Sequence, residues 1–401
     1  MDRSILKIYI ISLIDLLAVG LTFPLLFPHL RTLGASHFVV GVFGATYSGL
    51  QVLSGPVIGS WSDIRGRSSV ASVVLSISAV CYVLTGLTTS LAVIYILRIL
   101  LGFLKHTQTL CKALIADIVP KDKQTEVYGR STAVSSIGFI VGPIVGGHLI
   151  ELPNGFSYVC TLTSILFVIN IVLFRTFDDV ICGKVSEKKQ FHLTDIKQEF
   201  TKAVKELLEM DWKQYWDVFT LRFLYSFCIA IYFSNQSLFI SEQYQLSQKY
   251  IGYIISFFSI IGGLSSIAIG QIKVKFYNNQ NESLTLLLHL FLTMTFCFFG
   301  IHLSPNLGFL LVLLTPFAFS SAALRVLTME LILNRSHTND KGSLSGVANS
   351  VMSIGRFISP LISGIIADWC GESKVMLFAF IPSLFATFLC VKLIKTKSKA
   401  S

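Results

Sequence analysis

The sequence predicts an all-α polytopic membrane protein with twelve transmembrane helices in two six-helix bundles. Hydrophobic residues make up 53% of the 401 positions, only 13% are charged, and apolar runs long enough to cross a bilayer recur along the chain. Soluble domains carry about 25% charged residues, and a helix needs about 20 mainly apolar residues to cross the hydrocarbon core. The first run is too long for a cleaved signal peptide and lacks a small-residue cleavage site, so we expect it to span the membrane.

The apolar runs form two groups of six. The first group predicts spans at 5–28, 38–61, 69–89, 91–113, 131–150 and 157–174. The second predicts spans at 215–240, 249–272, 283–302, 308–332, 343–367 and 374–392. The expected domains are therefore an N-terminal bundle (1–174), a linker (175–214) and a C-terminal bundle (215–401). Apolar residues at helical spacing in the linker predict an amphipathic helix on the cytoplasmic membrane face, which we interpret as a tether in preference to a latch.

The positive charges are distributed unevenly between the two sides of the predicted spans. One set of alternate loops holds three of the 32 Lys and Arg residues, whereas about 25 lie in the tails, in the other loops or at their membrane edges. This asymmetry predicts that both termini are cytoplasmic. The net charge of +10 therefore reflects topology and contact with the lipid bilayer, and we expect no nucleic-acid partner. Four arginines lie within predicted spans: Arg98, Arg222, Arg325 and Arg356.

The two halves of the chain resemble each other when they are offset by 217 residues. GRSTAVSSIGFIVGPIVGG (129–147) then aligns with GVANSVMSIGRFISPLISG (346–364), and the same offset relates the preceding spans. Membrane helices are rich in glycine, so compositional bias is the alternative explanation, but a shared offset through two adjacent spans favours duplication. The halves are then parallel repeats related by a pseudo-twofold axis, an arrangement that suits alternating access to a midplane site.

The loop between the second and third spans reads GSWSDIRGRSS (59–69). It resembles the signature motif of the major facilitator superfamily, with matching residues at Gly59, Asp63, Gly66 and Arg67. The resemblance implies the major facilitator fold and a cytoplasmic gate in which Arg67 pairs with an acid at the end of span four, for which Asp117 is well placed. Two serines follow Arg67 where the family usually has basic residues, which predicts a weaker gate.

The fifth span is similar to the fifth-helix motif of facilitator-type antiporters. The matching residues are Gly129, Gly138, Gly142, Pro143, Gly146 and Gly147. Three of the glycines lie four residues apart on one helix face, which predicts close approach of a neighbouring backbone. Neighbouring helices can satisfy the carbonyl that the proline frees. We interpret this stretch as a packing surface that closes one gate, and antiport is what the resemblance implies.

Ionisable residues at bilayer depth are costly and usually line the bundle interior or a water-filled path. Asp15 lies in the first span, nine residues before Pro24, as in drug and tetracycline-type proton antiporters, and Arg98-x-x-x-Gly102 is similar to their fourth-helix motif. We expect Asp15 to pair with Arg98 and to gain and lose a proton during transport. The alternative is a permanent ion pair that never titrates.

Other polar residues within the spans are candidates for lining a central cavity. They are Lys105, His106, Asn235, Gln236, Arg325, Glu330 and Arg356. Arg98, Lys105 and Lys112 are seven residues apart, which predicts that they lie close to one stripe along the face of a continuous helix. Arg356 replaces Phe139 of the first repeat, so it is a candidate either for substrate selection or for a link to Glu330.

These observations predict a secondary active transporter of a small organic solute, with proton-coupled antiport as the preferred mode. No GxxxxGK[ST] stretch is found, so we expect no ATP to be used. No nucleophile–base or metal-ligand constellation stands out, so we expect no enzyme activity, catalytic residue, cofactor or metal. The alternatives are a uniporter in which the Asp15–Arg98 pair is fixed, and a transporter-like sensor or scaffold that moves no solute.

Overall fold

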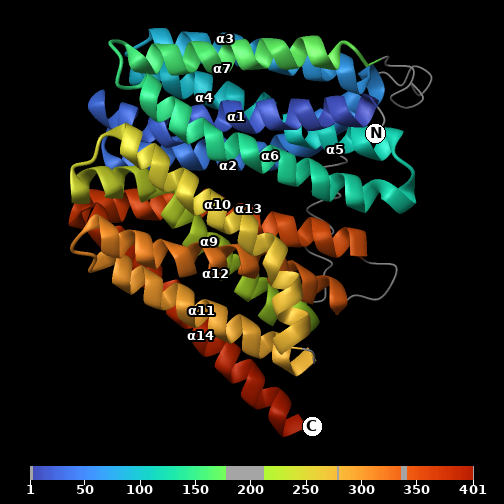
Figure 1. Cartoon of the computed structure of the whole chain (residues 1–401), viewed down its shortest axis with the longest axis vertical. Coiled ribbons are helices and arrows are strands. Elements are labelled where there is room, and N and C mark those ends of the chain that lie inside the picture. The colour runs from blue at the N-terminus through green and yellow to red at the C-terminus, as the bar shows by residue number, and fades with distance from the viewer. Residues whose placement is uncertain (1–2, 178–211, 278–279, 336–340, 401) are drawn as a thin grey trace. The chain divides into compact units, whose positions relative to one another are not determined.

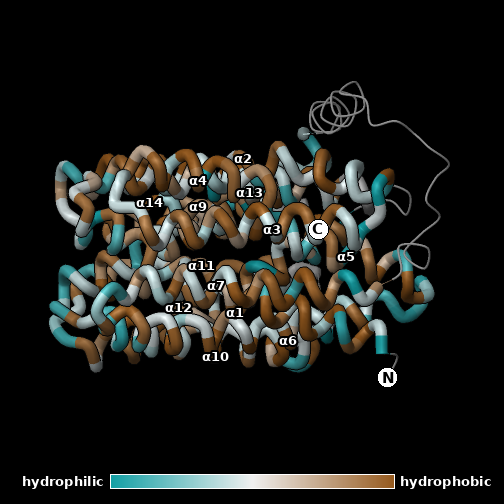
Figure 2. Tube along the Cα trace, turned by 90° about the horizontal axis from the view of Figure 1, so that it is seen from above, coloured by the Kyte–Doolittle hydropathy of each residue, from teal (hydrophilic) through white to brown (hydrophobic). Residues whose placement is uncertain are grey.

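The computed structural model describes residues 3–177, 212–277, 280–335 and 341–400, which form α-helices joined by short connections. Within these residues, twelve helical spans are long and apolar enough to cross a membrane, and this confirms the predicted number. Figure 2 shows hydrophobic residues along the helices and hydrophilic residues gathered at many of the helix ends. The amphipathic helix predicted within the linker lies outside the described residues.

The helices are labelled as in Figure 1. The first seven are α1 (Arg3–Thr32), α2 (His37–Arg65), α3 (Arg67–Leu87), α4 (Leu91–Leu104), α5 (Thr107–Ile118), α6 (Lys121–Leu149) and α7 (Gly155–Phe174). The others are α9 (Trp212–Tyr244), α10 (Gln248–Phe276), α11 (Gln280–His302), α12 (Leu307–Asn334), α13 (Lys341–Cys370) and α14 (Glu372–Ala400).

The chain divides into two compact units. Unit 1 comprises Met1–Ala35, Thr46–Val204 and Ser247–Ser256. Unit 2 comprises Ser36–Ala45, Lys205–Leu246 and Phe257–Ser401. Helices α2 and α10 are therefore each divided between the units, because the first residues of α2 belong to unit 2 and those of α10 to unit 1.

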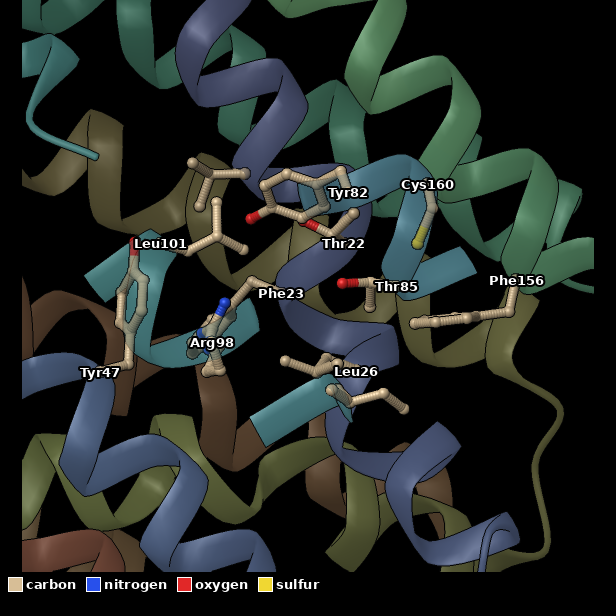
Figure 3. A pocket seen from close by; sticks show the side chains of 12 residues that line it. Thr22, Phe23, Leu26, Tyr47, Tyr82, Thr85, Arg98, Leu101, Phe156 and Cys160 are labelled. Atoms are coloured by element: carbon tan, nitrogen blue, oxygen red, sulfur yellow. The ribbon is translucent and has the colours of Figure 1, made fainter. Parts of the chain in front are cut away.

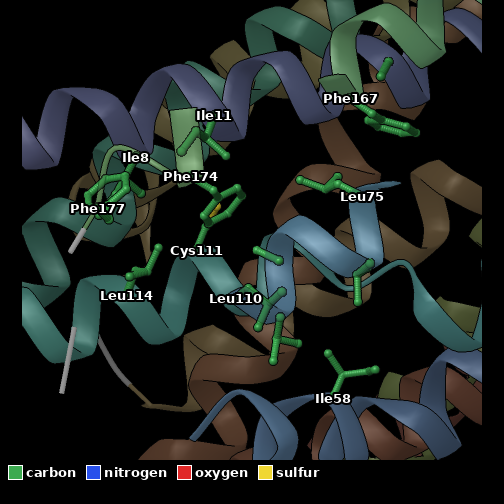
Figure 4. Packing of buried hydrophobic residues seen from close by; sticks show 14 of the residues in the cluster. Ile8, Ile11, Ile58, Leu75, Leu110, Cys111, Leu114, Phe167, Phe174 and Phe177 are labelled. Atoms are coloured by element: carbon green, nitrogen blue, oxygen red, sulfur yellow. The ribbon is translucent and has the colours of Figure 1, made fainter. Parts of the chain in front are cut away.

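The core of unit 1 is built where α1 packs against α6 and α7, and α3 packs against α7. Figure 4 shows part of this cluster, in which aromatic and branched aliphatic side chains from several helices fill one interior. Its fully buried members include Ile11, Leu75, Leu114, Phe167 and Phe174. Lipid provides no hydrophobic driving force between helices, so such packing contributes to stability mainly through van der Waals contact.

In unit 2, α9 is the central helix and contacts α12, α13 and α14. Tyr232 of α9 lies against Phe317 of α12 with ring centroids 4.8 Å apart, and against Phe258 of α10 at 5.3 Å. Edge-on and offset aromatic pairs of this kind contribute about 0.5–1.5 kcal/mol beyond the area that they bury. The aromatic cluster therefore fixes α9 against two neighbours in the middle of the unit.

The glycines of α6 form the packing surface that their spacing indicates. A Cβ atom on Gly142 would lie 2.7 Å from the Cα of Gly20 in α1, and one on Gly146 would lie 2.6 Å from the carbonyl oxygen of Leu21. These distances are shorter than any real Cβ contact, so only glycine permits this approach of α1. The role of the surface as a gate remains a proposal.

The repeat detected in the sequence recurs as matching contacts in the two units. Gly138 meets the backbone of α1, and its counterpart Gly355 meets α9 at Ser226 and Phe227. Gly147 meets the first residues of α10, and its counterpart Gly364 meets the first residues of α2. Equivalent glycines thus perform equivalent packing, which compositional bias alone would not produce.

The beginning of α2 is held in unit 2 by two acidic side chains. The backbone N–H groups of His37 and Phe38 donate to the Asp368 carboxylate at 2.8 and 2.9 Å. The Nδ1 atom of His37 lies 2.6 Å from Oε1 of Glu372. An acid at a helix N-terminus satisfies N–H groups that have no intrahelical partner, and its charge interacts favourably with the helix dipole. Asp368 therefore caps α2 from a distant part of the chain.

Candidate functional site

Span four is interrupted near its middle. Helix α4 ends at Leu104 and α5 begins at Thr107, and the two residues between them have non-helical backbone angles (φ −76°, ψ 87° at Lys105; φ −123°, ψ 32° at His106). The sequence-based expectation that Arg98, Lys105 and Lys112 share one helical stripe is therefore wrong, because the interruption changes the direction of the side chains that follow it. Discontinuous helices with exposed backbone groups occur in transporters at their binding sites.

Side chains of α2 contact the interruption. Gln51 donates from Nε2 to the Lys105 carbonyl at 3.2 Å. The Ser54 hydroxyl lies 2.7 Å from the Leu50 carbonyl of its own helix and 2.8 Å from Nε2 of His106, with the Gly102 carbonyl farther away at 3.5 Å. Non-helical backbone at membrane depth is tolerated where protein groups replace the missing hydrogen bonds. The polar residues of α2 are thus part of the reason that span four can break here.

A buried ion pair lies at the interruption. Asp15 of α1 is 1% exposed, and its Oδ1 atom lies 3.1 Å from Nζ of Lys105. Its second oxygen accepts a hydrogen bond from Nε2 of Gln108 at 3.0 Å. The expected pair between Asp15 and Arg98 is therefore wrong: Lys105 is the partner, because the non-helical backbone allows its side chain to reach α1.

Arg98 instead faces a small cavity within unit 1. Its guanidinium carbon lies 3.8 Å from the centre of the Tyr47 ring, the residue is 7% exposed, and among the described residues its Nε atom has no hydrogen-bond partner. Figure 3 shows Arg98 beside Tyr47, with Thr85 and Phe156 further along the same cavity. The lining residues are Val19, Thr22, Phe23, Leu26, Tyr47, Tyr82, Thr85, Ile94, Arg98, Leu101, Phe156 and Cys160, and the cavity volume is about 40 Å³.

A chain of contacts connects this cavity to the ion pair. Tyr47 stacks on Arg98, and its hydroxyl accepts a hydrogen bond from Gln51 at 3.0 Å. The same amide nitrogen of Gln51 donates to the carbonyl of Lys105, whose ammonium group holds Asp15. Sequence reasoning missed Tyr47, Gln51 and Gln108, because polar residues spaced along separate helices carry no signal until the packing is known.

The predicted pair between Arg67 and Asp117 is present, and its role as a cytoplasmic gate stays a prediction. Arg67 donates from Nε to Oδ2 of Asp117 at 3.0 Å and also forms an ion pair with Asp63. Its Nη1 atom lies 3.4 Å from the carbonyl oxygen of Gly59. Gly66 has a φ of +92°, a conformation that other residues rarely adopt, which explains why glycine stands at this turn.

In unit 2 the polar candidates are separated into different contacts. Glu330 forms an ion pair with Lys273, so the alternative link between Arg356 and Glu330 is not formed. Arg356 donates from Nη2 to the hydroxyl of Ser353 at 3.1 Å. Arg325 donates from Nη2 to the hydroxyl of Ser266 at 3.4 Å.

Two further candidates, Asn235 and Gln236, are buried in α9. Asn235 donates from Nδ2 to the carbonyl of Ile231 at 2.7 Å, and Oε1 of Gln236 has no partner among the described residues. His106 is also buried, beside Ser54 as described above. Within the described part of the chain, no group of three or more His, Cys, Asp or Glu side chains is placed to hold a metal ion.

Comparison with known proteins identifies a family. The model of the Major Facilitator Superfamily matches residues 8–360. The chain is 24% identical to solute carrier family 22 member 18 of Rattus norvegicus over 380 residues, covering 92% of this chain and 89% of that protein. It is 32% identical to the class H tetracycline resistance protein of Pasteurella multocida over 183 residues, which is 44% of this chain and 45% of that protein.

Solved structures share the fold. The nucleoside transporter NupG has a TM-score of 0.79 at 13% identity, with 98% of this chain and all of that chain covered. The human organic anion transporter MFSD10 (TETRAN) has a TM-score of 0.68 at 18% identity, with 97% of this chain and all of that chain covered. The family match and the twelve apolar spans confirm an integral multi-pass membrane protein of the transporter class, not an enzyme. From the family match over most of its length, the chain belongs to the Major Facilitator Superfamily.

Proposed function

We propose that the protein moves a small organic solute by alternating access and couples this movement to protons in the opposite direction. The observation that carries the proposal is the buried Asp15–Lys105 ion pair at the interruption of span four. Relatives named as tetracycline and multidrug resistance proteins support export of a small organic solute, and the buried ion pair supports the proton coupling. The distribution of positive charge supports a cytoplasmic position for both termini and for the Arg67–Asp117 pair, and we include this orientation in the proposal.

The ion pair has the chemistry that a proton switch requires. At 3.1 Å the attraction between Asp15 and Lys105 is about 5 kcal/mol for an effective dielectric constant of about 20. Removing both charges from water costs several kcal/mol per ion and offsets this attraction. Protonation of the Asp15 carboxylate removes its negative charge, so the ammonium of Lys105 loses its electrostatic partner and is free to turn away.

The interruption gives Lys105 freedom to respond. Lys105 is the C-cap of α4, and α5 begins only at Thr107, so the torsion ψ of Lys105 is not fixed by an intrahelical hydrogen-bond ladder and its side chain can change direction with a local backbone rotation. Asp15 lies on α1, whose backbone also packs on the glycine surface of α6. A change in the Asp15–Lys105 pair therefore acts on two helices of unit 1 at a point of close packing.

The proposal is tested by proton flux in liposomes. Protein is reconstituted with a trapped pH dye, and gradients of organic anions, cations and neutral solutes are imposed on wild type and on Asp15→Asn. Asp122→Asn is the matched control, because Asp122 is an exposed carboxyl in the first turn of α6. We expect a solute-dependent pH change that Asp15→Asn abolishes and the control retains.

A second measurement separates coupling from general loss of function. Exchange of labelled for unlabelled solute requires no net proton movement, so Asp15→Asn should retain exchange while it loses accumulation driven by a pH gradient. Solute movement without pH change in wild type and in both variants would show a uniporter. An absence of solute movement across the panel in wild type would contradict transport and favour a sensor or scaffold.

A further inference from the structure

Some cationic side chains of the helical spans have acidic partners. Lys105 pairs with Asp15 and Lys273 with Glu330, and Arg335, which directly follows α12, pairs with Asp217. In contrast, Arg98, Arg222, Arg325 and Arg356 have no carboxylate within 4.0 Å among the described residues. Charged groups at bilayer depth are rare and normally pair with one another or with backbone carbonyls. Four arginines without acidic partners are therefore an unbalanced positive charge within the protein.

Three of these arginines lie close together in unit 2. Arg222 is 3% exposed and donates to the carbonyls of Ala348 and Arg325 and to the hydroxyl of Thr328 at 3.0–3.4 Å, all of which are neutral acceptors. The buried Tyr225 interacts electrostatically with Arg222, Arg325 and Arg356 together. Neighbouring like charges repel each other, so the arrangement is costly as it stands.

Two members of this cluster are open to a ligand. Arg325 and Arg356 are exposed, although both lie within membrane-spanning helices, and Arg356 is near the middle of α13. A guanidinium facing lipid would be expensive, so the exposed side of this cluster faces water rather than hydrocarbon. The departure of Arg356 from Phe139 in the first repeat gives unit 2 a charge that its duplicate lacks.

The fourth arginine, Arg98, supplies an independent observation in unit 1. It is more than nine-tenths buried, its Nε–H has no partner among the described residues, and it faces the cavity described above. A cavity of about 40 Å³ holds a few water molecules or a group the size of a carboxylate, so a larger solute could place only its head group there. The other lining residues, among them Phe23, Tyr82 and Phe156, are uncharged, so Arg98 is the charged group of this cavity.

We propose that the transported solute is an organic anion, and that arginines without an acidic partner bind carboxylate-type groups at two places that are considered separately: Arg98 at the cavity of unit 1, and the Arg222–Arg325–Arg356 cluster of unit 2. Arginine presents a planar fork of donors that matches carboxylate and phosphate geometry, which explains why arginine and not lysine occupies these positions. A bound anion supplies the charge that the chain itself lacks. The identity of the anion as the solute rests on the proposed transport function, whereas anion binding can be measured without transport.

The test measures ligand-induced thermal stabilisation of the full chain in nanodiscs of neutral phosphatidylcholine. The probes are benzoate, benzamide and benzylammonium, which are similar in size and differ in charge, at equal ionic strength. Wild type is compared with Arg98→Gln, Arg98→Lys, Arg356→Gln and the control Lys275→Gln, which removes an exposed charge from the last turn of α10. Among the residues that the structure describes, the side chain of Arg356 donates to a neighbour on its own helix, Ser353, and no tertiary hydrogen bond is lost when it is replaced.

We expect benzoate to raise the melting temperature of wild type and of Lys275→Gln, and the other two probes to have no such effect. Each arginine-to-glutamine substitution removes charge-assisted hydrogen bonds and should weaken benzoate binding roughly 10- to 100-fold. Arg98→Lys should lie between wild type and Arg98→Gln, since it keeps the charge but loses the fork. Equal stabilisation by all three probes, or equal benzoate binding in all variants, would overturn the proposal.

A second arm separates a solute from a lipid head group. The measurements are repeated in nanodiscs that contain phosphatidylglycerol, whose phosphate has the same chemistry. Persistence of the benzoate effect supports the solute as the source of the anion. Arginine-dependent stabilisation by phosphatidylglycerol, with no effect of benzoate in either lipid, would overturn the proposal of a solute site. The arginines would then bind lipid head groups. Failure of proton flux with intact benzoate binding would contradict coupling and leave the anion site standing.

Discussion

Substitution of Gly142 by alanine tests the packing of α6 on α1 most directly. The added methyl would lie 2.7 Å from both Cα and the carbonyl carbon of Gly20, and 2.8 Å from the nitrogen of Leu21. All of these are backbone atoms, so the collision cannot be relieved by rotating a side chain. Overpacking of this kind costs about 1–3 kcal/mol. The alanine also gains about 1 kcal/mol of helix propensity, which partly offsets that cost.

Gly129 in the same helix provides the matched control. No atom lies within 4 Å of a Cβ built there, so Gly129→Ala should gain helix propensity without collision. The propensity gain is common to the two variants and cancels in their difference. Gly142→Ala should therefore unfold with a free energy about 1–3 kcal/mol lower than Gly129→Ala, measured by equilibrium denaturation in mixed micelles. Equal free energies of unfolding would show that α1 does not approach α6 as described.

Other substitutions probe the ion pair, the gate turn and the cap of α2. Lys105→Met leaves the Asp15 carboxylate buried without its cationic partner and should lower the free energy of unfolding by about 3–5 kcal/mol. Adding Asp15→Asn to this variant should restore most of the lost free energy. A double-mutant cycle without such recovery would refute the pairing. Gly66→Ala places a side chain at a backbone φ of +92° and should lower the free energy of unfolding by about 1–3 kcal/mol. Gly59→Ala is the control: a Cβ there meets no atom within 4 Å, so it should not destabilise the protein in the same denaturation assay. Asp368→Ala removes two hydrogen bonds to the start of α2 and should lower the free energy of unfolding by about 0.5–2 kcal/mol. The specific sign of a lost cap is faster hydrogen exchange of the His37 and Phe38 amides. Unchanged exchange would exclude capping by Asp368.

Features governed by composition and short-range pattern could be predicted from the sequence. Hydrophobic run length determines the spans, because the bilayer sets the length of each helix. The Arg67–Asp117 pair followed from the family motif, and the glycine surface of α6 followed from its four-residue spacing, since that spacing places small residues on one face. The 217-residue repeat was detectable because its two copies retain the same packing constraints.

The partner of Asp15 could not be predicted in the same way. Periodicity assumes a continuous helix, and the sequence around Lys105 contains no proline or glycine to mark an interruption there, although Gly102 lies three residues earlier. The break is accompanied by a hydrogen bond from Gln51, which lies on a different helix, to the Lys105 carbonyl, and by contact of Ser54 with His106. Long-range compensation of this kind is invisible to any pattern read along one segment. The absence of acidic partners for the four arginines could not be predicted for the same reason, because ion-pair partners on other helices are known only once the helices are packed.

The interruption of span four also separates the two halves of that span mechanically. A continuous helix transmits rotation, so turning one end turns every side chain along it. Helices α4 and α5 share no intrahelical hydrogen bonds across Lys105 and His106 beyond those that end each segment, and Gln51 of α2 donates to the Lys105 carbonyl. Arg98 on α4 can therefore rotate about the helix axis while Gln108 on α5 keeps its hydrogen bond to Asp15. Under the proposed function, such independent rotation of the two segments would allow ligand binding and proton binding in separate steps.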